Sequence, residues 1–345
     1  MSKGIKKMKL IRNLVVLIDG TDCDFGKKSH VEWSNVARIY NFCERLKLEG
    51  DRQQIAQYFD GVGARKSESV VLDEMFGMAL GERVEEAYGW LKKEVHNAMV
   101  DGVEAHVYLF GFSRGAFAVR WLAALLDFCG VPTEHENKFE GIAAFTQGDK
   151  KAADERITSG RYSKVSIDFI GVFDTVKARP GSEYGVRVLP VSVLNAYHAM
   201  AIDEWRSDFD VLPFNDDDRV KQMWFAGGHS DIGGGYGDPD ADDQETLKNR
   251  YASDIAYDWV AQHAKDCGLL MSETYVPFSF DESVKPVFHD ARTWYYKLSN
   301  IFTAASRLFL RTVPPSAIVH PSVETWLYRY DFVHANWSPS KNNVV

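Results

Sequence analysis

One short stretch of the chain, VYLFGFSRGAFAVRWL, joins an apolar run to a helical pattern through a single serine. The run VYLF is typical of a buried strand, and the apolar residues that follow Arg114 or Gly115 are spaced as in a buried helix. Gly111 and Gly115 flank Ser113, because a turn this tight between a strand and a helix leaves no room for side chains beside the serine. This stretch therefore predicts a sheet whose edge presents Ser113.

Four further segments read as short buried strands, and helical patterns separate most of the five. The five strand segments are NLVVLID, QIAQYFD, AHVYLFGFS, VSIDFIGVFD and QMWFAGGH, and the helical segments between them include NVARIYNFCERLK and RVEEAYGWLKKEVHNAM. Alternation of this kind predicts an α/β fold, with a mostly parallel central sheet and helices on both faces. We expect one domain over residues 1–345, because a chain of 345 residues can bury a large core.

Each predicted strand ends at a polar residue that can take part in chemistry. These residues are Asp19, Asp60, Ser113, Asp174 and His229. The carboxyl ends of parallel strands lie at one edge of a sheet, so we expect these residues near a common rim. Asp60 stands in DGVG, where a role as a turn former is the simpler interpretation.

Three of these residues follow the chain order of a nucleophilic triad. The G-x-S-x-G pattern alone is a weak signal, but its strand and helix favour Ser113 as a nucleophile over a turn serine. A serine hydroxyl needs a base within hydrogen-bond reach and an acid that orients the base. Asp174 and His229 follow Ser113 in the order of α/β-hydrolases.

Three alternatives to these assignments stay open at the level of sequence. His320 and His198 also follow the serine and compete with His229 for the role of base. Asp231 lies close to His229 in the chain, too close to be its natural orienting partner, although it could assist.

The reaction of a serine nucleophile also needs two hydrogen-bond donors for the oxyanion that develops on the attacked carbonyl. The N–H of Arg114, directly after the nucleophile, is the expected first donor. The segment LVVLIDGTD offers the second at Gly20 or Thr21. The alternative for DGT is an Asp-Gly turn at the start of a helix.

Composition excludes several other classes of function. A net charge of −9 argues against a nucleic acid as partner, and the four cysteines form no C-x-x-C pair that would suggest zinc. We expect no metal and no cofactor. The chain has no secretory signal pattern and no run of about 18 apolar residues, so we expect it to be made in the cytoplasm.

Two segments allow other interpretations. A loop rich in aspartate could hold a cation in a binding module, although a solvated loop is the simpler interpretation; its residues are Asp238, Asp240, Asp242 and Asp243. Residues 294–310 have an apolar face at helical spacing that suits either the core or a lid, and 288–345 could form a cap. A catalytically inert hydrolase fold that acts through protein contacts is the remaining alternative.

Eight ordered motifs resemble one known family over about residues 13–323. They are LIDGTD, NVARIY, YFDGVG, GFSRGAF, GVFDTV, YHAMAIDEWR, WFAGGHSDIGGGY and HPSV. The chain resembles the domain-of-unknown-function α/β-hydrolases that include the type VI secretion phospholipase effectors of the first lipase class. The resemblance implies an α/β-hydrolase fold, a lipase or phospholipase activity on acyl esters of glycerophospholipids, and Ser113, Asp174 and His229 as the triad.

The same resemblance implies partners and a place of action. The substrate would be a lipid, met at a membrane surface. An effector would also meet a secretion carrier and an immunity protein, and it would act in the periplasm or in another cell.

Overall fold

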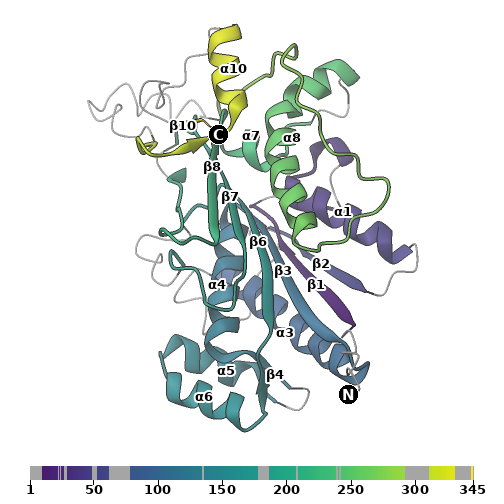
Figure 1. Ribbon diagram of the computed structural model, residues 1–345, viewed down its shortest axis with the longest axis vertical. Helices are drawn as coiled ribbons and strands as arrows, with labels where there is room; N and C mark the ends of the chain where they lie inside the picture. Colours follow the sequence, from purple (N-terminus) through teal and green to yellow (C-terminus); the bar gives the residue numbers. More distant parts are fainter. Residues whose placement is uncertain are drawn as a thin grey trace, which may run out of the picture.

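An eight-stranded parallel sheet forms the centre of the computed structural model (Figure 1), with the strand order β10-β9-β8-β7-β6-β3-β1-β2. The structure describes residues 10–21, 23, 25–26, 29–48, 53–61, 78–133, 136–177, 186–206, 209–237, 240, 242–291, 311–330 and 343–344. The expectation of an α/β-hydrolase-like fold with a mostly parallel sheet is confirmed.

The elements alternate along the chain as expected. The strands of the main sheet are β1 (Ile11–Ile18), β2 (Gln54–Phe59), β3 (Glu104–Phe112), β6 (Ser166–Phe173), β7 (Ala196–Ala201), β8 (Val220–Phe225), β9 (Ile318–Val319) and β10 (Asn343–Val344). The helices are α1 (Asn35–Leu48), α3 (Met78–Val100), α4 (Arg114–Cys129), α5 (Lys138–Thr146), α6 (Lys150–Thr158), α7 (His229–Gly233), α8 (Asp243–Asp266) and α10 (Pro321–Tyr330), with a 3₁₀ turn at His30–Glu32. Strands β4 (Val131–Pro132) and β5 (Tyr162–Ser163) form a small antiparallel pair.

Helices cover both faces of the sheet, so its central strands are apolar on both sides. Along β1, Leu14 and Val16 pack with α3 and α4, whereas Val15 and Leu17 pack with α1 and α8. All four side chains are fully buried, and each such burial stabilises the fold by about 1.5–3 kcal/mol. Figure 1 shows α1 and α8 side by side on one face.

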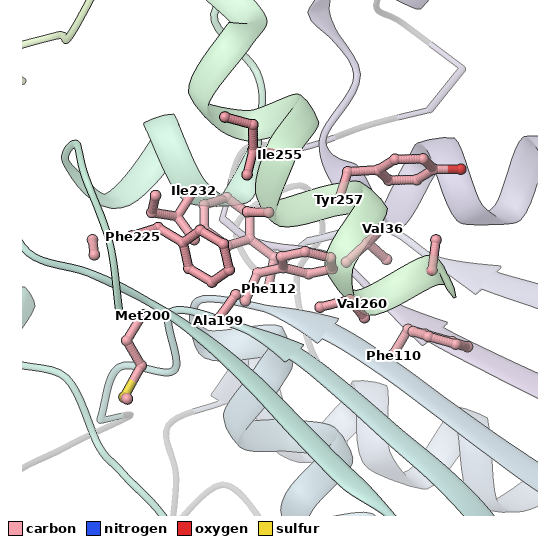
Figure 2. Close-up of a cluster of buried hydrophobic side chains, with 14 of the residues drawn as sticks. Val36, Phe110, Phe112, Ala199, Met200, Phe225, Ile232, Ile255, Tyr257 and Val260 are labelled. Atoms are coloured by element: carbon pink, nitrogen blue, oxygen red, sulfur yellow. The ribbon is translucent and has the colours of Figure 1, made fainter. Parts of the chain in front are cut away.

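The core on the side of α8 lies directly beneath the carboxyl ends of the strands. Figure 2 shows Val260 of α8 near Phe110 of β3, and Ile255 of α8 on the side of Ile232. Alternate residues of β3 point to this side, which places Phe112, the last residue of the strand, in the same cluster. Ser113 therefore follows a side chain that is anchored in the core.

Strand β7 was not among the strands predicted from sequence, and it changes how the site is assembled. It pairs with β6 on one side and with β8 on the other. Asp174 follows β6 and His229 follows β8, so their strands are separated by one further strand, or about 10 Å. The loop after β8 and the short helix α7 must therefore lead His229 back toward Asp174.

Two expectations concern other parts of the chain. Residues 294–310, with the apolar face that suits a core helix or a lid, lie outside the described residues. Within the described residues, no helix combines the length and the apolar character needed to cross a membrane.

Candidate active site

Ser113 occupies a sharp turn between β3 and α4. Its backbone has φ 58° and ψ −125°, a conformation that residues with a side chain rarely adopt. A Cβ at Gly115 would lie 2.2 Å from the carbonyl oxygen of Ile18, and one at Gly111 would lie 2.6 Å from the carbonyl oxygen of Gly115. The two glycines are thus required by the close approach of α4 to β1 and β3.

Asp174 is held in a similar way. With φ 41°, it is the one other non-glycine residue with positive φ in the described part of the chain. The turns that carry Ser113 and Asp174 are also bonded to each other. The N–H of Ser113 donates to Phe173 O at 3.0 Å, and the N–H of Val176 donates to Ser113 O at 3.4 Å. Strain of this kind collects at functional sites, because the surrounding structure must hold it in place.

His229 and Asp174 form a short buried hydrogen bond. Nδ1 of His229 lies 2.5 Å from Oδ2 of Asp174, and their side chains are 4% and 0% exposed. A carboxylate only accepts, so Nδ1 carries the proton and Nε2 keeps its lone pair. Oδ1 of Asp174 accepts a bond from the N–H of Ala201 at 2.9 Å, which fixes the carboxylate to the end of β7.

Two aromatic rings hold the imidazole of His229. The ring of Phe112 lies at a centroid distance of 4.7 Å, and that of Phe209 lies edge-on at 4.9 Å. A Cβ at Gly233 would lie 2.0 Å from the Phe112 ring, and one at Gly20 would lie 2.6 Å from it. Glycines in these two loops therefore make room for the ring that supports His229.

The segment DEWR after β7 fixes the loop that leads to His229. Asp203 accepts a hydrogen bond from the N–H of Gly227 at 2.8 Å, and Glu204 accepts one from the N–H of His229 at 3.2 Å. Arg206 in turn binds both carboxylate oxygens of Glu204 at 2.9 Å. These contacts return the chain after β8 toward Asp174, across the width of β7.

Arg311 was not predicted as a site residue, yet it binds Asp174 through both ends of its guanidinium. Nη1 donates to Oδ1 at 2.7 Å and Nη2 to Oδ2 at 2.8 Å. Burial alone would raise the pKa of Asp174, but the charge of Arg311 and the bond to His229 outweigh it, so this pKa lies well below its usual value. One sequence signal was available, since Arg311 is a lone charge in the apolar stretch LFLRTV.

The pKa of His229 lies below its usual value. Burial is the largest cause, because it penalises the charged imidazolium. The carboxylates of Asp174 and Glu204 oppose this effect, whereas the positive charge of Arg311 adds to it. The imidazole is therefore uncharged at neutral pH and can accept a proton.

Ser113 and His229 line one pocket of about 560 Å³, a volume typical of small-molecule sites. The other described residues of its wall are Thr21, Cys23, Phe112, Arg114, Val176, Lys177, Arg206, Phe209, Ser230, Gly234, Gly235 and Tyr236. Three of them are cationic and none carries a carboxylate. The structure thus brings together Ser113, His229, Arg114 and Thr21, with Asp174 behind His229.

The expected oxyanion donors differ in how they are placed. Arg114 opens α4 directly after Ser113, so its N–H lies in the first helical turn, at the positive end of the helix dipole. Thr21 lines the pocket, and its Oγ1 is buried with no hydrogen-bond partner among the described residues. The N–H of Gly20 instead donates to Oδ1 of Asp19 at 2.6 Å.

Asp19 supports this loop from below. It is fully buried, and its Oδ2 accepts bonds from Tyr58 Oη at 2.6 Å and from Ser34 Oγ. Burial raises its pKa, and the hydrogen bonds oppose that rise. Asp19 therefore organises the loop after β1. Asp60, the other aspartate predicted at this edge of the sheet, is not among the residues of the pocket wall.

The structure places the three competing residues in other contacts. His198 is fully buried on β7, where Nε2 accepts a bond from the N–H of Thr175 at 3.1 Å. His320 stacks on Phe225 and bonds Ser322. Neither histidine is part of the pocket wall.

Asp231 pairs with another histidine. Its carboxylate accepts the N–H groups of Gly228 and His289 at 2.9 and 3.0 Å, and Oδ1 lies 2.7 Å from Nδ1 of His289.

The aspartate-rich loop shows a structural role for one of its members. Asp242 caps α8 by accepting a bond from the N–H of Glu245 at 2.8 Å. Asp238 lies outside the described residues. In the part of the chain that the structure describes, no group of three or more His, Cys, Asp or Glu side chains could hold a metal ion.

Comparison with known proteins gives relatives of greater length than this chain. An uncharacterized protein of Saccharomyces cerevisiae, YEL023C, is 27% identical over 240 residues, which cover 59% of this chain and 33% of the relative. An uncharacterized protein from Pseudomonas aeruginosa aligns with TM-score 0.47 and 17% identity over 76% of this chain and 46% of its own. The Tle1 effector bound to the VgrG spike of the type 6 secretion system aligns with TM-score 0.38 and 19% identity, over 67% and 53% of the two chains.

A family model matches most of the chain. It is described as the catalytic domain of Tle1-like phospholipase effectors of the type VI secretion system, and it covers residues 12–263. That stretch contains Ser113, Asp174 and His229, together with both glycines of the turn at Ser113. The chain belongs to the family of Tle1-like phospholipase effector catalytic domains.

Proposed function

We propose that this chain is a serine hydrolase that cleaves acyl esters of glycerophospholipids, with Ser113 as nucleophile, His229 as base and Asp174 as orienting acid. The observation that carries the proposal is the buried bond of 2.5 Å between Asp174 and His229. His229 lines the same pocket as Ser113. Membership in a phospholipase family supports the same reaction.

In this mechanism, Nε2 of His229 takes the proton of Ser113 as Oγ attacks the acyl carbonyl. The carbonyl oxygen becomes an oxyanion, which the N–H of Arg114 and the N–H or hydroxyl of Thr21 stabilise. His229 then gives the proton to the leaving alcohol, and water repeats the cycle on the acyl enzyme. The first turn of α4 adds the positive end of a helix dipole at the same place.

The pocket wall supports an ester with an anionic group. Arg114 and Lys177 contribute positive charge, whereas the charge of Arg206 is balanced by Glu204. The apolar part of the wall includes Phe112, Val176 and Phe209. A phosphate beside an acyl chain combines one anionic and one apolar part in a single substrate. A glycerophospholipid fits this wall better than a neutral short ester does.

We also infer that the protein is an effector that a secretion carrier delivers to another cell, where it meets membrane lipid. The family description supports this inference, as does the VgrG spike seen with one structural relative. The test is a competition between cells in which the attacker carries either wild type or Ser113→Ala. Equal survival of the target cells would contradict the inference.

Two measurements on purified protein test the reaction. A fluorophosphonate probe should label wild type and should not label Ser113→Ala, which removes one hydroxyl and keeps the turn. Ser230→Ala is the matched control, since Ser230 lines the same pocket, and it should still be labelled. Labelling of Ser113→Ala would place the nucleophile elsewhere.

The substrate is tested with phospholipid vesicles. Wild type should release free fatty acid and a lysophospholipid, and EDTA should leave the rate unchanged because the triad supplies both nucleophile and base. If the protein hydrolyses short esters but releases no fatty acid from vesicles, it is a serine hydrolase whose substrate is not a phospholipid. Loss of the activity in EDTA would point to a cation site.

A further inference from the structure

Asp174, Arg311 and His229 meet at the back of the proposed triad, and the charges of Asp174 and Arg311 balance without a proton on His229. Asp174 and Arg311 are a buried pair, with side chains 0% and 3% exposed. A buried carboxylate needs a compensating positive charge, because its hydration is lost. In a triad without Arg311, protonated His229 would be the nearest group able to compensate the charge of Asp174.

We propose that Arg311 is a positioning residue of the triad: it is the counter-ion of Asp174, so that His229 rests uncharged and keeps its lone pair for the proton of Ser113. The inference rests on the proposed function for the role of Ser113. The pairing of Arg311 with Asp174 is independent of the substrate.

The geometry suits orientation as well as charge. The two bonds of 2.7 and 2.8 Å engage both oxygens of Asp174, which prevents the carboxylate from rotating away from His229. Arg311 is itself anchored, because Nη1 donates to Ala201 O at 2.9 Å and Nη2 donates to Phe209 O. The guanidinium thereby ties the acid to the end of β7 and to the residue whose ring packs on His229.

The other groups around His229 do not replace this counter-ion. Glu204 accepts the backbone N–H of His229, but its charge is paired with Arg206. The rings of Phe112 and Phe209 pack on the imidazole and bring no charge to it. Among the described residues, the charges that act on His229 are those of Asp174, Arg311 and Glu204. Arg114 and Lys177 line the same pocket.

The position of Arg311 in the chain adds to the significance of the contact. Ser113, Asp174 and His229 all lie within the family match at residues 12–263, whereas Arg311 lies beyond it. A segment outside the matched stretch thus completes the acid of the proposed site.

The direct test is the titration of His229, followed by NMR of protein labelled at histidine Cε1, with the resonance assigned by its absence in His229→Gln. In wild type, His229 should titrate below about 6.5. In Arg311→Gln it should titrate about one pH unit higher or more, because the imidazolium replaces the lost counter-ion. In Arg311→Lys, which keeps the charge, it should remain near the wild-type value.

Kinetics supply a second readout. The acidic limb of kcat/KM for a short acyl ester should move to higher pH in Arg311→Gln. Arg311→Lys should keep the wild-type limb but lose about tenfold to a hundredfold in kcat with little change in KM, because one ammonium cannot hold both carboxylate oxygens. Arg120→Lys is the matched control, since Arg120 is also buried but, among the described residues, donates to the carbonyls of Val186, Leu212 and Pro213 and stacks on Phe214, with no carboxylate partner. It should leave the limb in place.

The outcomes separate this inference from the proposed function. Titration of His229 at the same pH in wild type and Arg311→Gln would overturn the role of Arg311, even if Ser113→Ala is inactive. Activity in Ser113→Ala would reject the proposed function, while the titration would still test the counter-ion. If circular dichroism shows that Arg311→Gln is unfolded, wild type and Arg311→Lys decide: a wild-type value above 6.5, or a large upward shift in the lysine variant, contradicts the inference.

Discussion

Oδ1 of Asp231 lies 2.7 Å from Nδ1 of His289, although Asp231 is only two positions from His229 in the chain. The carboxylate also accepts the N–H of Gly228 and thereby caps the start of α7. Asp174, which lies far from His229 in the sequence, binds its Nδ1 at 2.5 Å. The two aspartates can therefore be compared directly: Asp174 contacts His229 but is distant in the sequence, whereas Asp231 is close in the sequence but contacts His289.

Asp174→Asn should lower kcat for an acyl ester by about 10⁴, the cost of the corresponding change in a well-studied triad, because an amide cannot stabilise the imidazolium. Asp231→Asn should cost less than tenfold, with a loss of thermal stability as its main effect. Steady-state kinetics on both variants check this. A larger kinetic effect at Asp231 would mean that the acid is misassigned.

Thr21→Val should lower kcat by about 10² with KM nearly unchanged, if its hydroxyl helps to bind the oxyanion. Thr21→Ser should restore most of the rate, since it keeps the hydroxyl. Thr175→Val is the control, because its Oγ1 is also buried with no partner among the described residues, but Thr175 is not part of the pocket wall. Equal rates for Thr21→Val and wild type would show that the hydroxyl does not bind the oxyanion, and the backbone N–H of Thr21 would be the remaining donor at this position.

Gly115→Ala should destabilise the protein by several kcal/mol and abolish activity, because its Cβ would lie 2.2 Å from Ile18 O and the backbone cannot yield at low cost. Gly89→Ala, at a half-buried position of α3, meets only the end of the Lys138 side chain, at 3.3 Å or more, and should be neutral or stabilising by up to about 1 kcal/mol. Urea denaturation of both variants measures the difference. Similar midpoints would show that α4 can move away from β1.

The free energy of unfolding should fall as the pH falls from about 7 to 4. The folded protein holds the pKa of His198 at about 3 and that of His320 at about 4, because burial penalises the charged ring. In the unfolded chain both histidines bind a proton near pH 6.5. The free energy of unfolding is therefore at its full value above pH 6.5 and falls as the pH drops toward the pKa values of the folded protein. His320→Gln should reduce the loss by about 2–3 kcal/mol. Chemical denaturation at several pH values checks the slope, and an unchanged slope in this variant would contradict it.

The alternation of buried strands and helices could be read from the sequence because it depends on local patterns. The apolar runs that end at Asp19, Ser113 and Asp174 are strands, and their parallel arrangement brings their ends to one edge of the sheet. Strand β7 was missed because its sequence, AYHAMA, contains His198 and has none of the Val, Ile and Phe residues that mark the other strands. That histidine is tolerated in the core since it accepts the N–H of Thr175, a contact that no periodicity reveals.

Two features of the site could not be predicted from the sequence, because one depends on a partner far along the chain and the other on a side chain that bonds its neighbour's backbone. Arg311 contacts Asp174 across 137 positions, and no spacing rule connects the two. The N–H of Gly20 is engaged because the carboxylate of Asp19 turns back on its own backbone. By contrast, the roles of Gly111 and Gly115 follow from sterics within a single turn, and those could be predicted.

The long separation between Asp174 and Arg311 has a consequence during synthesis of the chain. Translation proceeds from the N-terminus, so Ser113, Asp174 and His229 leave the ribosome before the arginine that pairs with the acid. A nascent chain or a truncated product that ends before Arg311 has the three residues of the proposed triad but lacks the guanidinium that balances the charge of the buried carboxylate. Under the proposed function, this order delays full activity until the segment that carries Arg311 has been synthesised.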